Sequence, residues 1–505
     1  MEALGDLMAG FAVALQPLNL LYCFLGVLVG TLVGVLPGLG PTAAIAILVP
    51  ITSGLPVTAA IIMLAGIYYG AMYGGSTTSI LINTPGEAAS VVTAIDGYQM
   101  ARQGRAGPAL GMAAIASFIA GTISLLGLVL VAPPLADMAL KFGPPEYFAL
   151  LVLGLSIIVG LAGKSLVKGL VSGLFGLLLG AIGIDPQTGL GRYTFGNPNL
   201  MGGVDFVSVI VGIFAISEVL SNAEQPALEV YKSKLQGLLP TRQDLLDCTG
   251  ALWRGSITGF LLGLLPGVTP SVVSFISYDM ERRSSKHPDL FGTGRIEGVA
   301  APEGANNSAT SGGFVPLFTL GIPTTPALAV LMGALMIQGL QPGPLLFEQH
   351  KEFVWGVIAS MYVGNVMLLA LNLPLIGLWV SLTKIPYPLL GPGILAICFV
   401  GAYGIRNSMF DVWVMLVFGF IGYLMQKLQF PSIPLVIALV LADRVESAFR
   451  QSLSMSSGDL TIFLSRPISA VLLLVAVASV TFAIYSRLRR PTTAAVLAQA
   501  ESDKQ

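Results

Sequence analysis

Hydroxyl and amide side chains are concentrated in short segments of an otherwise apolar chain. The first segment reads GGSTTSILINTPGE at 74–87, and the second reads NNSATSGG at 306–313, followed by GIPTTP at 321–326. Neutral donors suit a carboxylate, and carbonyl oxygens beside Gly or Pro suit Na⁺. The alternative is helix packing, since small residues let helices approach and Ser or Thr bond across them. Asn83, Asn306 and Asn307 favour a binding site, because a buried amide is costly unless it is hydrogen-bonded.

A Pro-Gly break occurs twice, as GVLPGLGPT at 34–42 and as GLLPGVTPS at 263–271. Pro41 and Pro270 each fit the first position of a new helix, where a missing N–H costs nothing. The N-terminus of a helix offers free N–H groups and partial positive charge, which suits an anion. A single break of this kind would indicate a packing kink. The duplication favours an anion site of the sort found in transporters.

Acidic residues near these segments are candidates for a proton or cation site. Glu87 follows the first segment directly, and Glu303 lies three residues before Asn306. An ionisable group at membrane depth is a functional candidate by default. The alternative for both is an acid at the N-cap or in the first turn of a helix. Asp96 and Glu446 are predicted to lie at the membrane surface.

Catalytic motifs are absent from the sequence. The two histidines, His287 and His350, lie in polar segments beside lysines, and there is no HExxH, GxSxG or Walker motif. The chain is therefore predicted not to be an enzyme and to need no cofactor beyond a coupled Na⁺ or H⁺. The formal net charge of −1 gives no indication of nucleic-acid binding, and three cysteines give no disulfide framework.

The composition is that of an integral membrane protein. Hydrophobic residues make up 54% of the 505 residues, charged residues only 10%, and the mean hydropathy is +0.83. Soluble domains carry about 25% charged residues. Residues 109–131 and 353–381 have no charge and are long enough to span a bilayer. The N-terminus has no basic residue before its first apolar run, so it is not predicted to be a signal peptide.

The landmarks recur in the same order, which predicts an internal repeat. Gly26 and Gly30 precede the first break as Gly255 and Gly259 precede the second, and each half then has Gly-Gly, Pro, Gln-Gly and Gly-Pro in turn. The predicted fold is all-α and polytopic, with two inverted-topology repeats, broken helices and re-entrant hairpins at the midplane. We divide the chain into a first membrane repeat at 1–222, a polar linker at 223–250, a second membrane repeat at 251–450, an extra C-terminal transmembrane helix at 451–490 and a disordered tail at 491–505.

The distribution of basic residues predicts that the repeats are inverted. Short loops rich in Lys and Arg face the cytoplasm. The loop after the second break carries four basic residues, Arg282, Arg283, Lys286 and Arg295, whereas residues 50–57 after the first break carry none. Lys351 and Arg406 are exceptions. We predict a multi-pass protein of the bacterial inner membrane, with a cytoplasmic C-terminus and a periplasmic N-terminus.

The sequence resembles the large membrane subunit (TctA) of the tripartite tricarboxylate transporter family over nearly its whole length. Besides the first break, the resemblance is carried by YYGAMYGGSTTSILINTPGE at 68–87, DGYQMARQGRAGPAL at 96–110, APEGANNSATSGG at 301–313 and TLGIPTTPA at 319–327. The resemblance implies a small membrane subunit (TctB-like), a periplasmic solute-binding protein (TctC-like), an ion gradient as energy source, and citrate or another carboxylate as substrate. One departure is Ala442-Asp443-Arg444-Val445-Glu446-Ser447, where family members often have Gly-Pro and paired acids.

The predicted function is cation-driven uptake of carboxylates by symport, and the alternative is a stand-alone organic-anion carrier without a binding protein. The residues predicted to bind substrate share small, hydroxyl or amide side chains at the breaks and polar segments: Gly38, Gly40, Pro41, Thr42, Ser76, Thr77, Thr78, Asn83, Thr84, Gly86, Gly267, Thr269, Ser271, Asn306, Asn307, Thr310, Ser311, Thr324 and Thr325. Glu87 and Glu303 are the candidates for cation coupling, with Na⁺ near Asn83 and Asn306.

Overall fold

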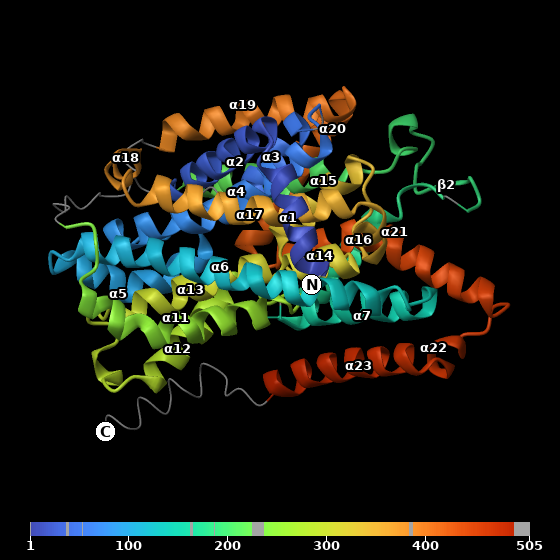
Figure 1. Cartoon of the computed structure of the whole chain (residues 1–505). Coiled ribbons are helices and arrows are strands. Elements are labelled where there is room, and N and C mark those ends of the chain that lie inside the picture. Colours follow the sequence, from blue (N-terminus) through green and yellow to red (C-terminus); the bar gives the residue numbers. More distant parts are fainter. Residues whose placement is uncertain are drawn as a thin grey trace, which may run out of the picture. The chain divides into compact units, whose positions relative to one another are not determined.

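The computed structural model describes residues 2–36, 40–52, 54–161, 165–185, 187–224, 237–382 and 387–488, and this part of the chain is almost entirely helical (Figure 1). Within these ranges, eight helices are long and apolar enough to span a membrane: Pro17–Val35, Val57–Ile82, Ala106–Ala139, Phe206–Ala223, Lys351–Asn372, Leu389–Arg406, Met409–Lys427 and Pro467–Tyr485. The prediction of an all-α, polytopic membrane protein is confirmed.

The chain folds into two compact units, Met1–Lys141 with Ile182–Leu428, and Phe142–Ala181 with Gln429–Gln505. Each unit draws on both halves of the sequence, so the units follow a different division from the predicted repeats. The predicted linker at 223–250 lies partly outside the described residues, and its last part, from Arg242, begins α11.

The first unit contains most of the secondary-structure elements of the described chain. In chain order they are α1 (Glu2–Ala14), α2 (Pro17–Val35), α3 (Pro41–Thr52), α4 (Val57–Ile82), the 3₁₀ turn η1 (Ala88–Ser90), α5 (Val91–Arg102), α6 (Ala106–Ala139), the short strands β1 (Gly183–Ile184) and β2 (Gly191–Arg192), η2 (Pro198–Leu200), α9 (Phe206–Ile210), the π-turn η3 (Val211–Ile216), α10 (Ser217–Ala223), α11 (Arg242–Gly263), α12 (Pro270–Ser284), η4 (Pro288–Leu290), α13 (Glu297–Gly312), α14 (Phe314–Leu320), α15 (Pro326–Ile337), α16 (Pro344–Gln349), α17 (Lys351–Asn372), α18 (Ile376–Leu382), α19 (Tyr387–Arg406) and α20 (Met409–Lys427). The two strands pair antiparallel, Gly183 with Arg192 and Ile184 with Gly191.

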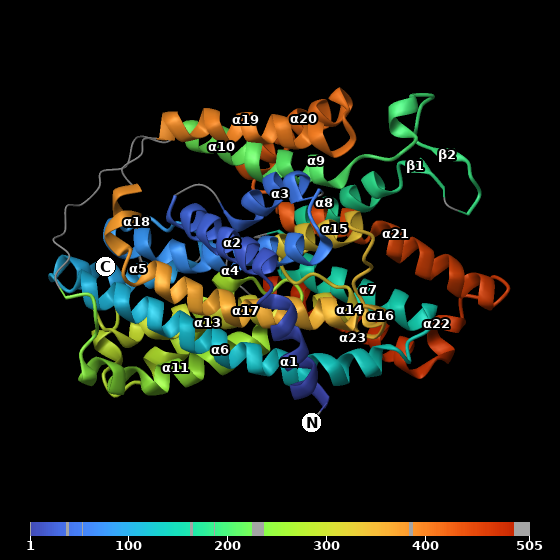
Figure 2. The ribbon, with the colours of Figure 1, turned by 45° about the horizontal axis from the view of Figure 1, so that its top comes forward.

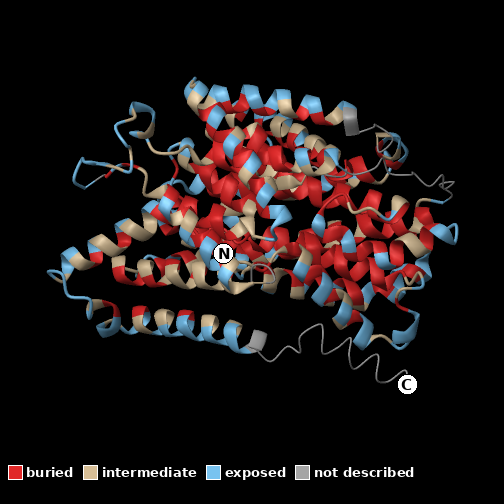
Figure 3. Cartoon of the chain, turned by 180° about the vertical axis from the view of Figure 1, so that it is seen from behind, coloured by how far each residue is buried: buried red, intermediate tan, exposed pale blue. Residues whose placement is uncertain are grey.

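The centre of the first unit is built from α2, α4 and α17, which pack on one another in both views (Figures 1 and 2), and from α13, which packs on α6 and α11. Figure 3 shows that buried residues are concentrated in the interior helices, whereas outer helix faces are intermediate or exposed. All of α13 and nearly all of α4 are buried. Both helices carry many polar side chains. Those side chains must therefore find hydrogen-bond partners inside the protein.

Glycines on α2 and α11 allow two very close helix contacts. A Cβ added at Gly30 would lie 2.6 Å from the carbonyl oxygen of Ile67 on α4, and one added at Gly259 would lie 2.4 Å from that of Ala305 on α13. One turn before and one turn after these two positions, the same contact is made again: Gly26 to Met63, Gly34 to Ala71, Gly255 to Ala301 and Gly263 to Ala309. The contact partners keep the register of the sequence repeat. The two sequence halves thus each contain the same glycine-lined helix pair.

Two helix ends also recur in the same order in both halves. Gln103 and Gln338 cap α5 and α15, and each is followed by a glycine with positive φ, 81° at Gly104 and 79° at Gly339. The ends of α4 and α14 correspond in the same way, with Asn83 at φ 53° and Gly321 at φ 67°. Glycine adopts this left-handed conformation freely, and asparagine is among the few other residues that do so routinely.

The second unit consists of α7 (Pro144–Leu161), α8 (Leu166–Gly180), α21 (Ser432–Met455), α22 (Ile462–Ser465) and α23 (Pro467–Leu488). Here α8 packs along α21, and α23 packs along α7. The divergent stretch Ala442–Ser447 lies inside α21, where Glu446 pairs with Arg450 at 2.6 Å. Only 11% of the Pro467–Tyr485 span is buried, so α23 presents an apolar surface suited to contact with lipid.

Candidate functional site

Both Pro-Gly breaks interrupt helices where the sequence predicts. The first lies between α2 and α3, which begins at Pro41, and the second lies between α11 and α12, which begins at Pro270. Gly38 lies outside the described residues. Gly40, Pro41, Thr42, Thr269 and Ser271 are partly exposed, and the Thr269 side chain makes no capping hydrogen bond to α12. The start of α12 is thus not capped by its own N-cap side chain.

Each Pro-Gly break contacts the polar turn that follows in its own half, at residues 83–86 in the first half and 321–326 in the second. In the second half, Gly267 (φ 81°) donates its backbone N–H to the carbonyl oxygen of Thr324 at 3.1 Å. In the first half, a Cβ on Gly86 would fall 1.9 Å from the carbonyl oxygen of Gly34. Glycine at position 86 is therefore required by the close approach of the turn to the end of α2.

Glu303, on α13, is the centre of a buried cluster of hydroxyl groups. Its side chain is 0% exposed. Ser76 on α4 donates to Oε2 at 2.6 Å, Ser117 on α6 donates to the same oxygen at 3.4 Å, and Thr93 on α5 donates to Oε1. Asn307 extends the cluster by donating from Nδ2 to Ser117 Oγ at 2.7 Å. Four helices from both halves therefore converge on one carboxylate.

Glu87 makes a different set of contacts. It is the N-cap of η1, where Oε2 accepts the backbone N–H of Ala89 at 2.7 Å, and Oε1 accepts Nδ2 of Asn306 at 3.3 Å. A Cβ on Gly75 would lie 2.6 Å from Glu87 Cγ, so the glycine makes room for this side chain. The N-cap alternative considered from the sequence applies to Glu87, together with a bond to the other half.

The charges of these two carboxylates are not balanced locally. Within the described residues, neither Glu87 nor Glu303 forms an ion pair with a Lys, Arg or His side chain. Among the residues predicted to bind substrate, the buried atoms Asn306 Oδ1, Asn307 Oδ1 and Thr324 Oγ1 have no hydrogen-bond partner in the described part of the chain. No group of three or more His, Cys, Asp or Glu side chains able to hold a metal occurs in the same ranges. The region is rich in oxygen atoms and poor in positive charge.

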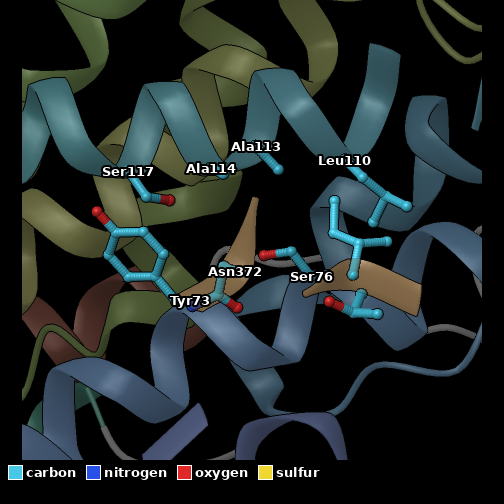
Figure 4. Close-up of a pocket in the computed structure, with 9 residues that line it drawn as sticks. Tyr73, Ser76, Leu110, Ala113, Ala114, Ser117 and Asn372 are labelled. Atoms are coloured by element: carbon cyan, nitrogen blue, oxygen red, sulfur yellow. The ribbon is translucent and has the colours of Figure 1, made fainter. Parts of the chain in front are cut away.

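A small cavity reaches the Glu303 cluster (Figure 4). Its polar lining comes from Tyr73, Ser76, Thr77, Ser117 and Asn372, and its apolar lining from Leu110, Ala113, Ala114 and Ile376. The side chains of Ser76 and Ser117 point into the space between their helices. The cavity measures about 10 Å³, close to the smallest space that holds one water.

Several other predicted residues make local hydrogen bonds of the kind expected from packing. Thr78, Thr310 and Ser311 each donate to a carbonyl three or four residues earlier in their own helix. Thr325 caps α15 by accepting from Leu328 N at 3.3 Å, and its hydroxyl lies 3.1 Å from Tyr68 Oη. For these hydroxyls the structure shows a local role that the sequence could not distinguish from binding.

Asn83 and Thr84 lie at the exposed end of α4. Asn83 is exposed and left-handed, whereas Thr84 is half-buried and its hydroxyl lies 3.3 Å from the carbonyl of Ile82. Asn306, the other residue predicted to lie near Na⁺, is buried. No hydrogen bond between Asn83 and Asn306 is present in the described part of the chain. The structure thus brings Asn306 and Asn307 to the acids and leaves Asn83 accessible.

Four residues of this region were missed by the sequence analysis. Thr93 and Ser117 bond to Glu303, and Tyr73 and Asn372 line the cavity. All four are polar residues of helices, with Thr93 in the first turn of α5 and Asn372 at the end of α17, and a polar side chain in an otherwise apolar helix indicates an internal partner. That signal was available in the sequence, but the identity of the partner was not.

Asp96 on α5 holds the start of α13 in place. It is fully buried. Oδ1 accepts the backbone N–H groups of Gly292, Gly294 and Arg295 at 2.8–2.9 Å, and Oδ2 accepts Tyr278 Oη at 2.8 Å. One turn earlier on α5, Thr93 reaches Glu303 on α13. The Asp96 contacts therefore fix the two helices whose side chains meet at the cluster.

Asp96→Ala is expected to destabilise the protein by several kcal/mol, because each unsatisfied buried group costs about 1–3 kcal/mol. Asp96→Asn keeps Oδ1 and should retain most of the stability. Thermal unfolding in detergent measures the difference, with Asp289→Ala, an exposed residue of the neighbouring turn η4, as control. Equal melting temperatures for Asp96→Ala and Asp289→Ala would contradict the assignment.

A multi-pass helical membrane protein with a buried polar cluster built by both halves is a structure suited to moving a solute. The chain belongs to the tripartite tricarboxylate transporter TctA family, whose family model matches residues 20–437. The resemblance stated from the sequence is thereby confirmed. Because this is a family of transporters, the membership agrees with the prediction that the chain is not an enzyme.

Two similar proteins come from Agrobacterium vitis. The first, "Uncharacterized 52.8 kDa protein in TAR-I ttuC' 3'region", is 49% identical over 490 residues, which are 97% of this chain and 98% of that protein. The second, "Uncharacterized protein in TAR-II ttuC' 3'region", is 44% identical over 231 residues, which are 46% of this chain and 96% of that protein. No solved structure matches the chain.

Proposed function

We propose that this chain is the membrane transport subunit of a tripartite uptake system that carries carboxylates into the cell by symport with a cation. The observation that carries the proposal is the pair of buried carboxylates, Glu87 and Glu303, at a cluster made by helices of both halves. A buried carboxylate without a cationic partner is strongly unfavourable. Binding of a cation, together with an anionic substrate, relieves that imbalance and couples the two solutes.

The anionic substrate is proposed to bind at the two break-and-turn regions. Helices α3 and α12 begin at Pro41 and Pro270, and their N-terminal amides carry partial positive charge. Asn83 and Thr84 add neutral polar groups that remain at least partly accessible. Amides and hydroxyls can bind a carboxylate without a buried Arg, which fits citrate-like tricarboxylates or related organic acids.

The function is tested by uptake of radiolabelled carboxylates into proteoliposomes containing this subunit and its small membrane partner. Uptake of one or more carboxylates should require an imposed Na⁺ or H⁺ gradient and the matching periplasmic binding protein. Uptake that is insensitive to both gradients would contradict symport.

The need for a binding protein is a separate prediction. Family membership implies TctB-like and TctC-like partners in general. We expect uptake in cells to collapse when the binding protein is deleted and to return when the protein is supplied in the periplasm. Full uptake without it would favour the alternative, a stand-alone organic-anion carrier.

The repeats are proposed to have inverted orientation in the inner membrane, with the C-terminus in the cytoplasm and the N-terminus in the periplasm. The recurring glycine contacts of α2 with α4 and of α11 with α13 support a structural repeat. The basic residues at 282–295, absent from 50–57, support inversion.

Cysteine labelling tests this orientation. Gly54→Cys is expected to react with an impermeant thiol reagent added outside sealed cells, and Ser284→Cys only after permeabilisation. Both positions are exposed, and the native Cys23, Cys248 and Cys398 are buried, so the background should be low. Equal labelling of both positions from outside would rule out the inverted arrangement.

A further inference from the structure

Glu87 and Glu303 differ in the chemistry of the groups that donate to them. The donors to Glu87 are N–H groups, from the backbone of Ala89 and the amide of Asn306. The donors to Glu303 are three hydroxyls, from Ser76, Thr93 and Ser117. An N–H group has no lone pair to offer a cation, whereas a hydroxyl can donate one bond and still present two acceptor lone pairs. The three hydroxyl oxygens around Glu303 are therefore available as cation ligands, whereas the N–H donors to Glu87 are not.

The hydroxyl groups around Glu303 offer oxygen ligands to a metal cation. Both carboxylate oxygens accept hydroxyl donors, and each hydroxyl oxygen keeps lone pairs that a cation can use. The Glu303 carboxyl group is fully buried and, when ionised, has no cationic side chain paired with it among the described residues. Such a charge needs a partner from solution.

Two further observations point to a bound ion. Asn307 is 3% exposed, its Nδ2 lies 2.7 Å from Ser117 Oγ, and the carbonyl oxygen of the same amide has no partner. A lone acceptor beside a cluster of oxygens is a natural ligand for a hard cation, which prefers oxygen. The cavity of about 10 Å³, with room for one water-sized particle, is lined by Ser76 and Ser117, which both bond to Glu303.

We propose that Glu303, Ser76, Thr93 and Ser117, with the carbonyl oxygen of Asn307, form a Na⁺ site, and that Glu87 instead positions the turn at 83–90. The inference rests on the proposed symport function and names its coupling site. Four helices, α4, α5, α6 and α13, supply the ligands. Occupation of the site therefore ties α4, α5 and α6 of the first half to α13 of the second.

Sodium-dependent stabilisation of the full-length purified protein tests the site without substrate. Thermal unfolding is followed in NaCl and in choline chloride at equal ionic strength. We expect Na⁺ to raise the melting temperature of the wild type, as any ligand that binds only the folded state does. Glu303→Gln should abolish the shift. Ser117→Ala, which removes one hydroxyl and leaves the charge, should raise the Na⁺ concentration for half the shift by about tenfold.

Two isosteric variants serve as comparisons. Glu87→Gln should keep a Na⁺-dependent shift, since its carboxylate accepts only N–H donors. Glu297 lies on the same helix as Glu303 but is paired with Arg295 at 2.5 Å. The Glu297→Gln variant should therefore keep the Na⁺ response of the wild type. A normal Na⁺ shift in Glu303→Gln and Ser117→Ala, or its loss in Glu87→Gln alone, would overturn the assignment. Wild-type uptake driven by H⁺ with no response to Na⁺ would overturn the site and leave the proposed transport function standing.

Discussion

Gly86→Ala is expected to prevent the accumulation of folded protein. The added Cβ would lie 1.9 Å from the carbonyl oxygen of Gly34, 2.8 Å from Thr78 Oγ1 and 2.9 Å from the Cα of Gly75. Two of the three neighbours are backbone atoms of α2 and α4, which are themselves in close contact, so they cannot move aside independently. Overpacking of this kind costs about 1–3 kcal/mol even where side chains can adjust, and here the cost should be higher.

The yield and melting temperature of the monodisperse protein in detergent measure the effect. Gly377→Ala on α18 is the matched control, because no atom lies within 4 Å of a Cβ at that position. We expect the control to match the wild type in both measurements. A Gly86→Ala protein with wild-type stability and uptake would show that the turn does not contact the end of α2 in the working protein.

Local features of the fold could be predicted because they depend on local chemistry. The apolar runs gave the spanning helices, and Pro41 and Pro270 marked the starts of α3 and α12. The Gln-Gly pairs became matching helix ends because only glycine adopts positive φ without strain. The compact units could not be predicted, since α7, α8 and α21 associate across a long stretch of sequence and nothing local encodes that contact.

The candidate site was predicted in part. Glu303, Asn306 and Asn307 were recognised because charges and amides are costly in an apolar helix. Their partners Thr93 and Ser117 were missed, because a hydroxyl in a helix can satisfy itself by bonding to the preceding turn. Thr310 and Ser311 do bond in this way, whereas Ser117 reaches across to another helix. Only the packing of α6 against α13 distinguishes the two cases.

Asn83→Ala is expected to abolish uptake. Two features of Asn83 can account for such a loss, its amide group and its left-handed backbone conformation, and the structure shows how to separate them. Asn83 ends α4 in the left-handed conformation at φ 53°. Alanine there loses the amide and also pays about 1–2 kcal/mol for the left-handed backbone. Loss of uptake in Asn83→Ala alone would therefore leave the amide and the backbone indistinguishable.

Asn83→Gly removes the amide while keeping the backbone, since the equivalent position of the second half, Gly321, is already a left-handed glycine. If the amide binds the substrate, Asn83→Gly should fold like the wild type and bind the carboxylate about tenfold or more weakly, the effect of one hydrogen bond to a charged group. Asn197→Ala removes an amide that caps η2, in the segment after β2, and should leave uptake nearly unchanged. The readout is uptake at several substrate concentrations, normalised to folded protein. Wild-type uptake by Asn83→Gly, with a defect only in Asn83→Ala, would mean that Asn83 stops the helix and that the substrate binds elsewhere.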